Sequence, residues 1–120
     1  MKQFIGKPPA APLTPAVRCG QFVFVSGQVP TEEDGSVPSG LADQTKLVLT
    51  KLKKLLEEAG FGLNDIVKTT VFLRDLADFD EMNTVYRSFF PMNPPARSCV
   101  KASVAIDVKL EIEAIAMKEG

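Results

Sequence analysis

The sequence contains no histidine and no tryptophan, and it has only two cysteines and one tyrosine among its 120 residues. Without histidine there is no imidazole for a Ser-His-Asp triad, for a histidine proton shuttle or for a metal site. Two cysteines, Cys19 and Cys99, are too few for a disulfide scaffold or a four-thiolate zinc site. The sequence therefore predicts no metal site, and we expect both cysteines as thiols.

Long apolar runs and an excess of charge of one sign are also missing. No apolar run approaches the roughly 20 residues of a membrane-spanning helix, and the N-terminus lacks the apolar core of a secretory signal. A cytoplasmic protein with no membrane partner is therefore expected. The 14 basic and 15 acidic residues give a formal charge of −1. Nucleic-acid-binding proteins are usually strongly basic, so we expect no nucleic-acid partner.

The residues that are present are typical of one small domain. With 120 residues, 45% of them hydrophobic, the chain predicts a single domain over residues 1–120. The predicted elements are a short strand within residues 1–15, a strand over 21–30, a helix over 41–59, a strand over 66–74, a helix over 79–89, and strands over 96–104 and 108–117. This β-β-α-β-α-β-β order indicates an α+β fold, a mixed sheet with two helices on one face.

The helix over 41–59 has the clearest pattern, because its apolar residues recur at helical spacing. Ser39 is the predicted N-cap, and Gly60 stands where a C′ glycine belongs. The charged residues of this helix, Lys51 among them, are predicted to lie on a solvated face.

The sheet is expected to have a second, apolar face. In the strand over 66–74, Val67 is predicted on the same side as Val71. Residues such as Phe22, Phe24 and Phe72 would be exposed on the face without helices. A bare apolar face is a recognition surface, and another copy of the chain is its simplest cover.

An arginine follows a proline-rich turn in the segment Pro94-Pro95-Ala96-Arg97. At the start of a strand, Arg97 has a fixed root and a planar head that suits bidentate binding of a carboxylate. The alternative is an ordinary ion pair with a neighbouring acidic side chain.

Two carboxylates, Glu111 and Glu113, share one face of the last predicted strand. A carboxylate near an arginine can orient a water or move a proton, whereas the alternative is a cross-strand ion pair. A tight hairpin of the last two strands would put Lys101 opposite Glu111 and Cys99 opposite Glu113. It would also leave Arg97 and Glu111 about 13 Å apart, at roughly 3.3 Å per residue.

Three further positions have a functional and a structural interpretation. Cys99 is a nucleophile only if its pKa is lowered, and without a histidine base a packed or site-lining thiol is favoured. The Ser26-Gly27 pair either offers backbone groups to a ligand or simply ends a strand. Phe89-Phe90 are core and interface aromatics in the simplest interpretation.

Several segments together carry a resemblance to a known family. They are Phe24-Val25-Ser26-Gly27-Gln28-Val29-Pro30, Asp65 to Leu73, Asn83 with Tyr86, Phe89 and Phe90, and Pro95-Ala96-Arg97-Ser98-Cys99-Val100 followed by Leu110 to Ala116. Over nearly the whole chain the sequence resembles the RidA (YjgF) family of enamine/imine deaminases. The resemblance implies a chorismate-mutase-like fold and a homotrimer with sites in the clefts between subunits.

The resemblance also implies an activity and a set of site residues. The archetype of this family hydrolyses reactive 2-aminoacrylate and related enamines or imines to 2-oxo acids and ammonium, without a cofactor. By analogy, Arg97 would hold the substrate carboxylate, and Glu111 would orient the water or assist proton transfer. The residues expected to line the pocket are Ser26, Gly27, Cys99, Asn83 and Phe89.

Two departures from the family pattern bear on the substrate. Ala16 stands where the family has a tyrosine, which predicts a roomier pocket, and Val104-Ala105-Ile106 replaces a Leu-Pro loop. The alternatives are a trimer that binds 2-oxo acids without efficient catalysis, a pathway-specific enzyme such as a 2-aminomuconate deaminase, and an RNA-cleaving protein. The charge balance and the missing histidine weigh against the last of these.

Overall fold

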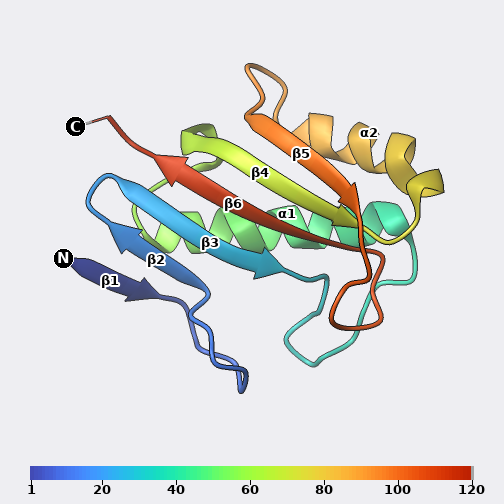
Figure 1. Ribbon diagram of the computed structural model, residues 1–120, viewed down its shortest axis with the longest axis horizontal. Helices are drawn as coiled ribbons and strands as arrows, with labels where there is room; N and C mark the ends of the chain where they lie inside the picture. The colour runs from blue at the N-terminus through green and yellow to red at the C-terminus, as the bar shows by residue number, and fades with distance from the viewer. Residues whose placement is uncertain (120) are drawn as a thin grey trace.

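Six strands and two α-helices follow one another along the chain, as Figure 1 shows. They are β1 (Lys2–Ile5), β2 (Ala16–Cys19), β3 (Phe22–Gln28), α1 (Leu41–Glu58), β4 (Ile66–Leu73), α2 (Phe79–Phe89), β5 (Ala96–Lys101) and β6 (Leu110–Met117). The computed structural model describes residues 1–119, and no helix within them is long and apolar enough to cross a membrane. The predicted α+β class and both helices are confirmed.

The strands form one mixed sheet in the order β1-β2-β3-β6-β4-β5. Every neighbouring pair is antiparallel except β4 and β5, which are parallel. Both helices cover the same face of the sheet, with α1 against β3 and β6 and α2 beside α1 (Figure 1). The predicted arrangement of two helices on one face is therefore confirmed.

Strand β2 is an element that the sequence did not predict. It is only 4 residues long, too short for an alternating pattern to be visible. It becomes a strand by pairing with β3 across a tight turn in which Gly20 has a positive φ of 61°. The sheet consequently has one strand more than expected.

The predicted hairpin of the last two strands is wrong, because β4 lies between β5 and β6. Strand β5 ends at Lys101, and the segment 102–109 then crosses to the far side of β4 instead of making a tight turn. Glu111 pairs with Phe72 of β4, so the expected pairing of Lys101 with Glu111 does not occur. The same holds for Cys99 and Glu113.

Two smaller expectations, the side of Val67 and the N-cap of α1, are wrong. Val67 is 44% exposed, on the side opposite to Val71, because a β-bulge between Ile66 and Lys68 shifts the alternation of β4. The N-cap of α1 is Gly40 rather than Ser39, and it makes no side-chain cap bond.

At the C-terminal end of α1 the expectation from the sequence is confirmed, whereas on its polar face the expectation for Lys51 is wrong. Gly60 has a positive φ of 82°, as predicted for a C′ glycine. Lys51 is not on a solvated face, since its ammonium group donates hydrogen bonds to Val29 and Thr31 and is half-buried. Long amphipathic side chains reach back over the sheet in this way, which spacing along a helix does not reveal.

The hydrophobic core lies between the sheet and the helices, and the opposite face stays apolar and uncovered. Phe22 and Phe24 are 41% and 48% exposed, and their rings stack with centroids 6.1 Å apart. Phe4 and Val100 are exposed as well. We call this helix-free side the open face. It is the expected apolar face, and an exposed apolar patch marks an interaction surface.

Candidate functional site

Arg97 projects from β5 toward the helices. It pairs with Thr69 of β4, which is fully buried under α2, and residues opposite each other on paired strands share a face. Its Nη1 atom donates a hydrogen bond to Asn83 Oδ1 at 2.7 Å. Its guanidinium carbon lies 4.9 Å from the ring centre of Tyr86 and 5.7 Å from that of Phe79. These contacts hold the guanidinium close to two aromatic rings.

The partners of Arg97 decide between its two interpretations. They are neutral groups, and the one ion pair within residues 1–119 joins Arg74 to Asp107. An ordinary ion pair with a neighbouring carboxylate is therefore absent from the described chain. A half-buried guanidinium without a counter-ion favours a bound anion, because charges are costly to bury unpaired.

The face of α2 that meets Arg97 carries Phe79, Asn83 and Tyr86, at the spacing of one helical stripe. The Tyr86 hydroxyl is 2.7 Å from Thr69 Oγ1, which anchors the ring on the sheet. Burial raises the pKa of Tyr86, so its hydroxyl stays protonated. Sequence reasoning missed Phe79 and Tyr86 as neighbours of Arg97. Their helical spacing was visible, but it is equally typical of a core stripe.

A cavity of about 260 Å³ opens beside Arg97. Its lining residues are Asn83, Tyr86, Arg87, Phe90, Pro94, Pro95 and Arg97. The volume lies just under the range of sites for drug-sized ligands and suits a small molecule. Phe90 lines it and packs on Tyr86 with ring centres 4.8 Å apart, whereas Phe89 packs against the core outside this lining.

Cys99 lies two residues after Arg97 on the same side of β5 and packs half-buried against the core. Burial raises the pKa of the Cys99 thiol, and the nearby Arg97 charge offsets part of that rise. The thiol is therefore held in its protonated form, which favours a packed, site-lining group over a nucleophile.

Glu111 lies on the open face, on the side of the sheet opposite to Arg97. It pairs with Phe72, whereas Arg97 pairs with Thr69, and side chains three residues apart on one strand point to opposite faces. Two strand spacings, about 10 Å, also separate β6 from β5. The structure thus does not bring Arg97 and Glu111 together within one chain.

Glu111 instead lies directly over Gly27. A Cβ atom on Gly27 would overlap the Glu111 carboxylate, so a larger residue there would push the carboxylate aside. Gly27 stands in an irregular stretch of β3 between Val25 and Gln28, where the register with β6 shifts. The Gln28 side chain donates to the Ser26 carbonyl at 3.0 Å, and Ser26 Oγ donates to Thr14 O at 2.7 Å. The Ser26 hydroxyl therefore anchors the preceding loop.

The environment of Glu111 makes its carboxyl a weaker acid. Burial raises the pKa of the Glu111 carboxyl, and the negative charge of Glu113 raises it further. A carboxyl with a raised pKa accepts a proton more readily than an exposed one, which is the property of a general base.

Ala16 does not open a pocket in this chain. It is fully buried in the core and pairs with Val25, on the helix side of the sheet. The reason is that the unpredicted strand β2 turns this side chain inward. A roomier pocket between subunits at this position therefore stays a prediction.

Known proteins resemble this chain over nearly its whole length. A sequence model of the family described as Endoribonuclease L-PSP matches residues 4–118. A RutC family protein of Pyrococcus abyssi is 47% identical over 114 residues, which cover 92% of this chain and 90% of that protein. The 2-iminobutanoate/2-iminopropanoate deaminase of Escherichia coli is 44% identical over 117 residues, covering 92% and 91%.

Solved structures show the same fold. The crystal structure of Escherichia coli TdcF with bound serine superposes with a TM-score of 0.93 at 39% identity, covering 98% of this chain and 99% of that one. The structure of yeast Mmf1 gives a TM-score of 0.93 at 35% identity, covering 99% and 100%.

Proposed function

The chain belongs to the Endoribonuclease L-PSP (RidA/YjgF) family of enamine/imine deaminases, and we propose that it hydrolyses 2-imino acids and their enamine tautomers to 2-oxo acids. In this reaction water adds across the C=N bond of the imine, and the C–N bond of the resulting carbinolamine then breaks. The products are the 2-oxo acid and ammonia, which takes up a proton to leave as ammonium.

The observation that carries this proposal is Arg97, a half-buried guanidinium with no carboxylate partner within residues 1–119. Asn83 and the Tyr86 ring hold it, which leaves the rest of its planar donor set for a ligand. A carboxylate is the anion that such a fork binds in bidentate fashion. Every 2-imino acid carries one next to its reacting carbon.

Glu111 supplies the proton chemistry in this proposal. Its carboxylate takes a proton from the attacking water and returns one to the departing nitrogen. The raised pKa supports both transfers, because it brings the group nearer to the working pH. An imine carbon is already electrophilic, so holding the anion and delivering water suffices for catalysis.

The site we propose is completed by a second copy of the chain. Arg97 and Glu111 lie on opposite faces of one sheet, so a ligand as small as an imino acid meets both only if they come from two copies. Two features favour this assembly: β5 is an edge strand, and the open face carries exposed Phe22 and Phe24. The trimer implied by the sequence resemblance closes three such sites symmetrically.

Two related proteins support a small acid as the ligand. The structure of TdcF contains bound serine, and another relative is named for 2-iminobutanoate and 2-iminopropanoate. RNA cleavage is the alternative raised by the family's description as an endoribonuclease. The formal charge of −1 and the lack of histidine oppose it.

The test is an imine-trapping assay. An amino-acid oxidase generates 2-imino acids from several L-amino acids, and semicarbazide traps those that survive. We expect the wild-type protein to suppress trapping and the Arg97→Ala variant to have lost most of this effect. Full suppression by Arg97→Ala would remove Arg97 from the site, and no suppression by wild type for any amino acid would refute the deaminase proposal.

The assembly has its own test. Phe24→Asp puts a charge into the open face, and we expect it to give monomers in sedimentation while the isolated fold persists in circular dichroism. A variant that assembles like wild type would contradict the role of the open face. Retained activity in monomers would contradict a site shared between copies.

A further inference from the structure

Two polar side chains of α1 reach the segments on either side of the Gly27–Glu111 contact. Gln44 and Lys51 are seven residues apart, which is two helical turns, so they lie on the same face of α1. From the sequence, Lys51 was predicted on a solvated face and Gln44 was not considered, because polar residues on a helix are usually solvated.

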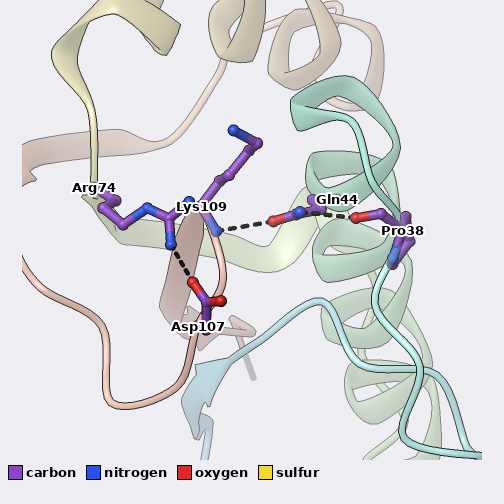
Figure 2. Close-up of polar contacts among 5 residues, drawn as sticks. All are labelled: Pro38, Gln44, Arg74, Asp107 and Lys109. Atoms are coloured by element: carbon purple, nitrogen blue, oxygen red, sulfur yellow. Dashed lines mark hydrogen bonds and ion pairs between the residues drawn. The ribbon is translucent and has the colours of Figure 1, made fainter.

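Gln44 is a buried amide, only 4% exposed, that joins two loops (Figure 2). Its Nε2 donates to the Pro38 carbonyl at 2.8 Å, and its Oε1 accepts from the Lys109 backbone N–H at 2.9 Å. Lys109 precedes Glu111 by two residues. The amide thus fixes the backbone at the point where β6 begins, immediately before the proposed base.

Lys51 fixes the backbone that follows Gly27 in a similar way. Its Nζ donates to the Val29 carbonyl at 2.8 Å and to the carbonyl and Oγ1 of Thr31 at 3.2 and 3.1 Å. Val29 follows Gly27 by two residues. Burial lowers the pKa of Lys51, which agrees with an ammonium held among carbonyl groups rather than in water. All of its three donors have acceptors close by.

We propose that Gln44 and Lys51 are positioning residues, which hold the Glu111 strand and the Gly27 strand in the register that the proposed site requires. The proposal rests on the deaminase function given above. The contact between Gly27 and the Glu111 carboxylate leaves no space for a methyl group, so small shifts of either backbone displace the carboxylate. Displacements of about 1 Å in a catalytic group can lower the rate by about 100-fold.

The same region offers matched controls. Arg74 also contacts the 102–109 segment, through an ion pair of 2.6 Å with Asp107 (Figure 2), but both side chains are well exposed. Lys54 is an exposed lysine on α1. Exposed contacts of this kind contribute little energy, so their removal leaves the backbone where it is.

The experiment compares Gln44→Met and Lys51→Met with Arg74→Met and Lys54→Met in the trapping assay. Affinity for pyruvate, measured by calorimetry, reports separately on the carboxylate site at Arg97. We expect the first two variants to lose about 10- to 100-fold in kcat with pyruvate affinity and assembly retained. Lys51→Arg, which keeps a cationic donor, should restore most of kcat, and the two controls should behave as wild type.

Four outcomes separate the possible failures. Wild-type kcat in both methionine variants, with activity lost in Glu111→Gln, would overturn the positioning role and leave the proposed function intact. If the methionine variants lost kcat, pyruvate affinity and assembly in parallel, both residues would act only through the stability of the fold. That result would also overturn the positioning role. Full activity of Glu111→Gln would overturn the positioning role together with the role of Glu111 as the base, whereas no imine hydrolysis by the wild type would refute the proposed function itself.

Discussion

The two faces of the sheet hold the two halves of the candidate site in different ways. On the helix face, Arg97 is fixed by residues of its own chain, Asn83 and Tyr86 of α2. On the open face, Glu111 lies over the bare backbone of Gly27, and no ion pair within residues 1–119 involves it. One half is therefore built by side-chain contacts within the domain, and the other by the shape of the backbone.

This difference indicates separate tasks for the two halves. A guanidinium that its own helix holds in place is ready to bind an anion before any substrate arrives. A partly buried carboxyl with a raised pKa is suited to exchange protons instead. Variants on the helix face should consequently affect binding, and variants on the open face should affect turnover.

The largest effect is expected for Glu111→Gln, which keeps the shape of the side chain but removes the base. General acid–base catalysis accounts for about 100- to 10,000-fold in rate, so kcat should fall within that range. Pyruvate affinity should be retained, because Arg97 is untouched. Steady-state kinetics with calorimetry would check this, and a loss confined to binding would contradict the division between the faces.

A smaller loss is expected for Gly27→Ala, because the added Cβ would overlap the Glu111 carboxylate and push it aside. A displacement of this size should lower kcat by about 100-fold. Gly40→Ala is the matched control, since a Cβ at Gly40 meets nothing within 4 Å. Equal kcat values for the two variants would show that Gly27 does not position Glu111.

The helix face is probed by Arg97→Ala, whose effect should come through KM. Hydrogen bonds to charged groups are worth about 1.5–3 kcal/mol, so kcat/KM should fall about 10- to 100-fold. Arg97→Lys keeps the charge but not the bidentate geometry and should recover only part of the loss. Pyruvate titration of both variants is the measurement, and full affinity in Arg97→Ala would move the anion site elsewhere.

The smallest effect should be a shift in the pH profile of Glu113→Gln. The ionised form of Glu111 is the base, so kcat rises as pH increases through its raised pKa. Removing the Glu113 charge takes away the second cause of that rise and moves the profile to lower pH. Burial, the larger cause, remains, so the pKa of Glu111 should still lie above the ordinary value of a glutamate. Glu57→Gln, at an exposed position, is the control. An unshifted profile in Glu113→Gln, or an equal shift in Glu57→Gln, would contradict this.

Much of the fold was predictable from local patterns. The apolar spacing of α1, its C′ glycine Gly60, the apolar run of β3 and the alternation of β6 specify elements that depend on near neighbours in the chain. Strand β2 was not predicted, because its 4 residues are too few to show an alternating pattern. It is a strand because it pairs with β1 and β3. The hairpin of the last strands was mispredicted because strand order depends on contacts far apart in sequence.

The candidate site divides in the same way. Arg97, Glu111, Gly27 and Asn83 were singled out from the sequence by residue type and by resemblance. The contribution of Phe79 and Tyr86 could not be read from their spacing, because core aromatics have the same spacing. The hydrogen bonds of Gln44 and Lys51 were equally hidden, since their partners are backbone atoms of distant loops.

The sequence by itself determined the family, the fold class and the kinds of side chain that are available for chemistry. Those properties depend on residue identity and on short-range periodicity, which a linear chain displays directly. Only the tertiary structure decided that Arg97 and Glu111 face opposite sides of the sheet. The physical reason is that β4 inserts between β5 and β6, so a side chain's face follows from strand pairing rather than from its position along the chain.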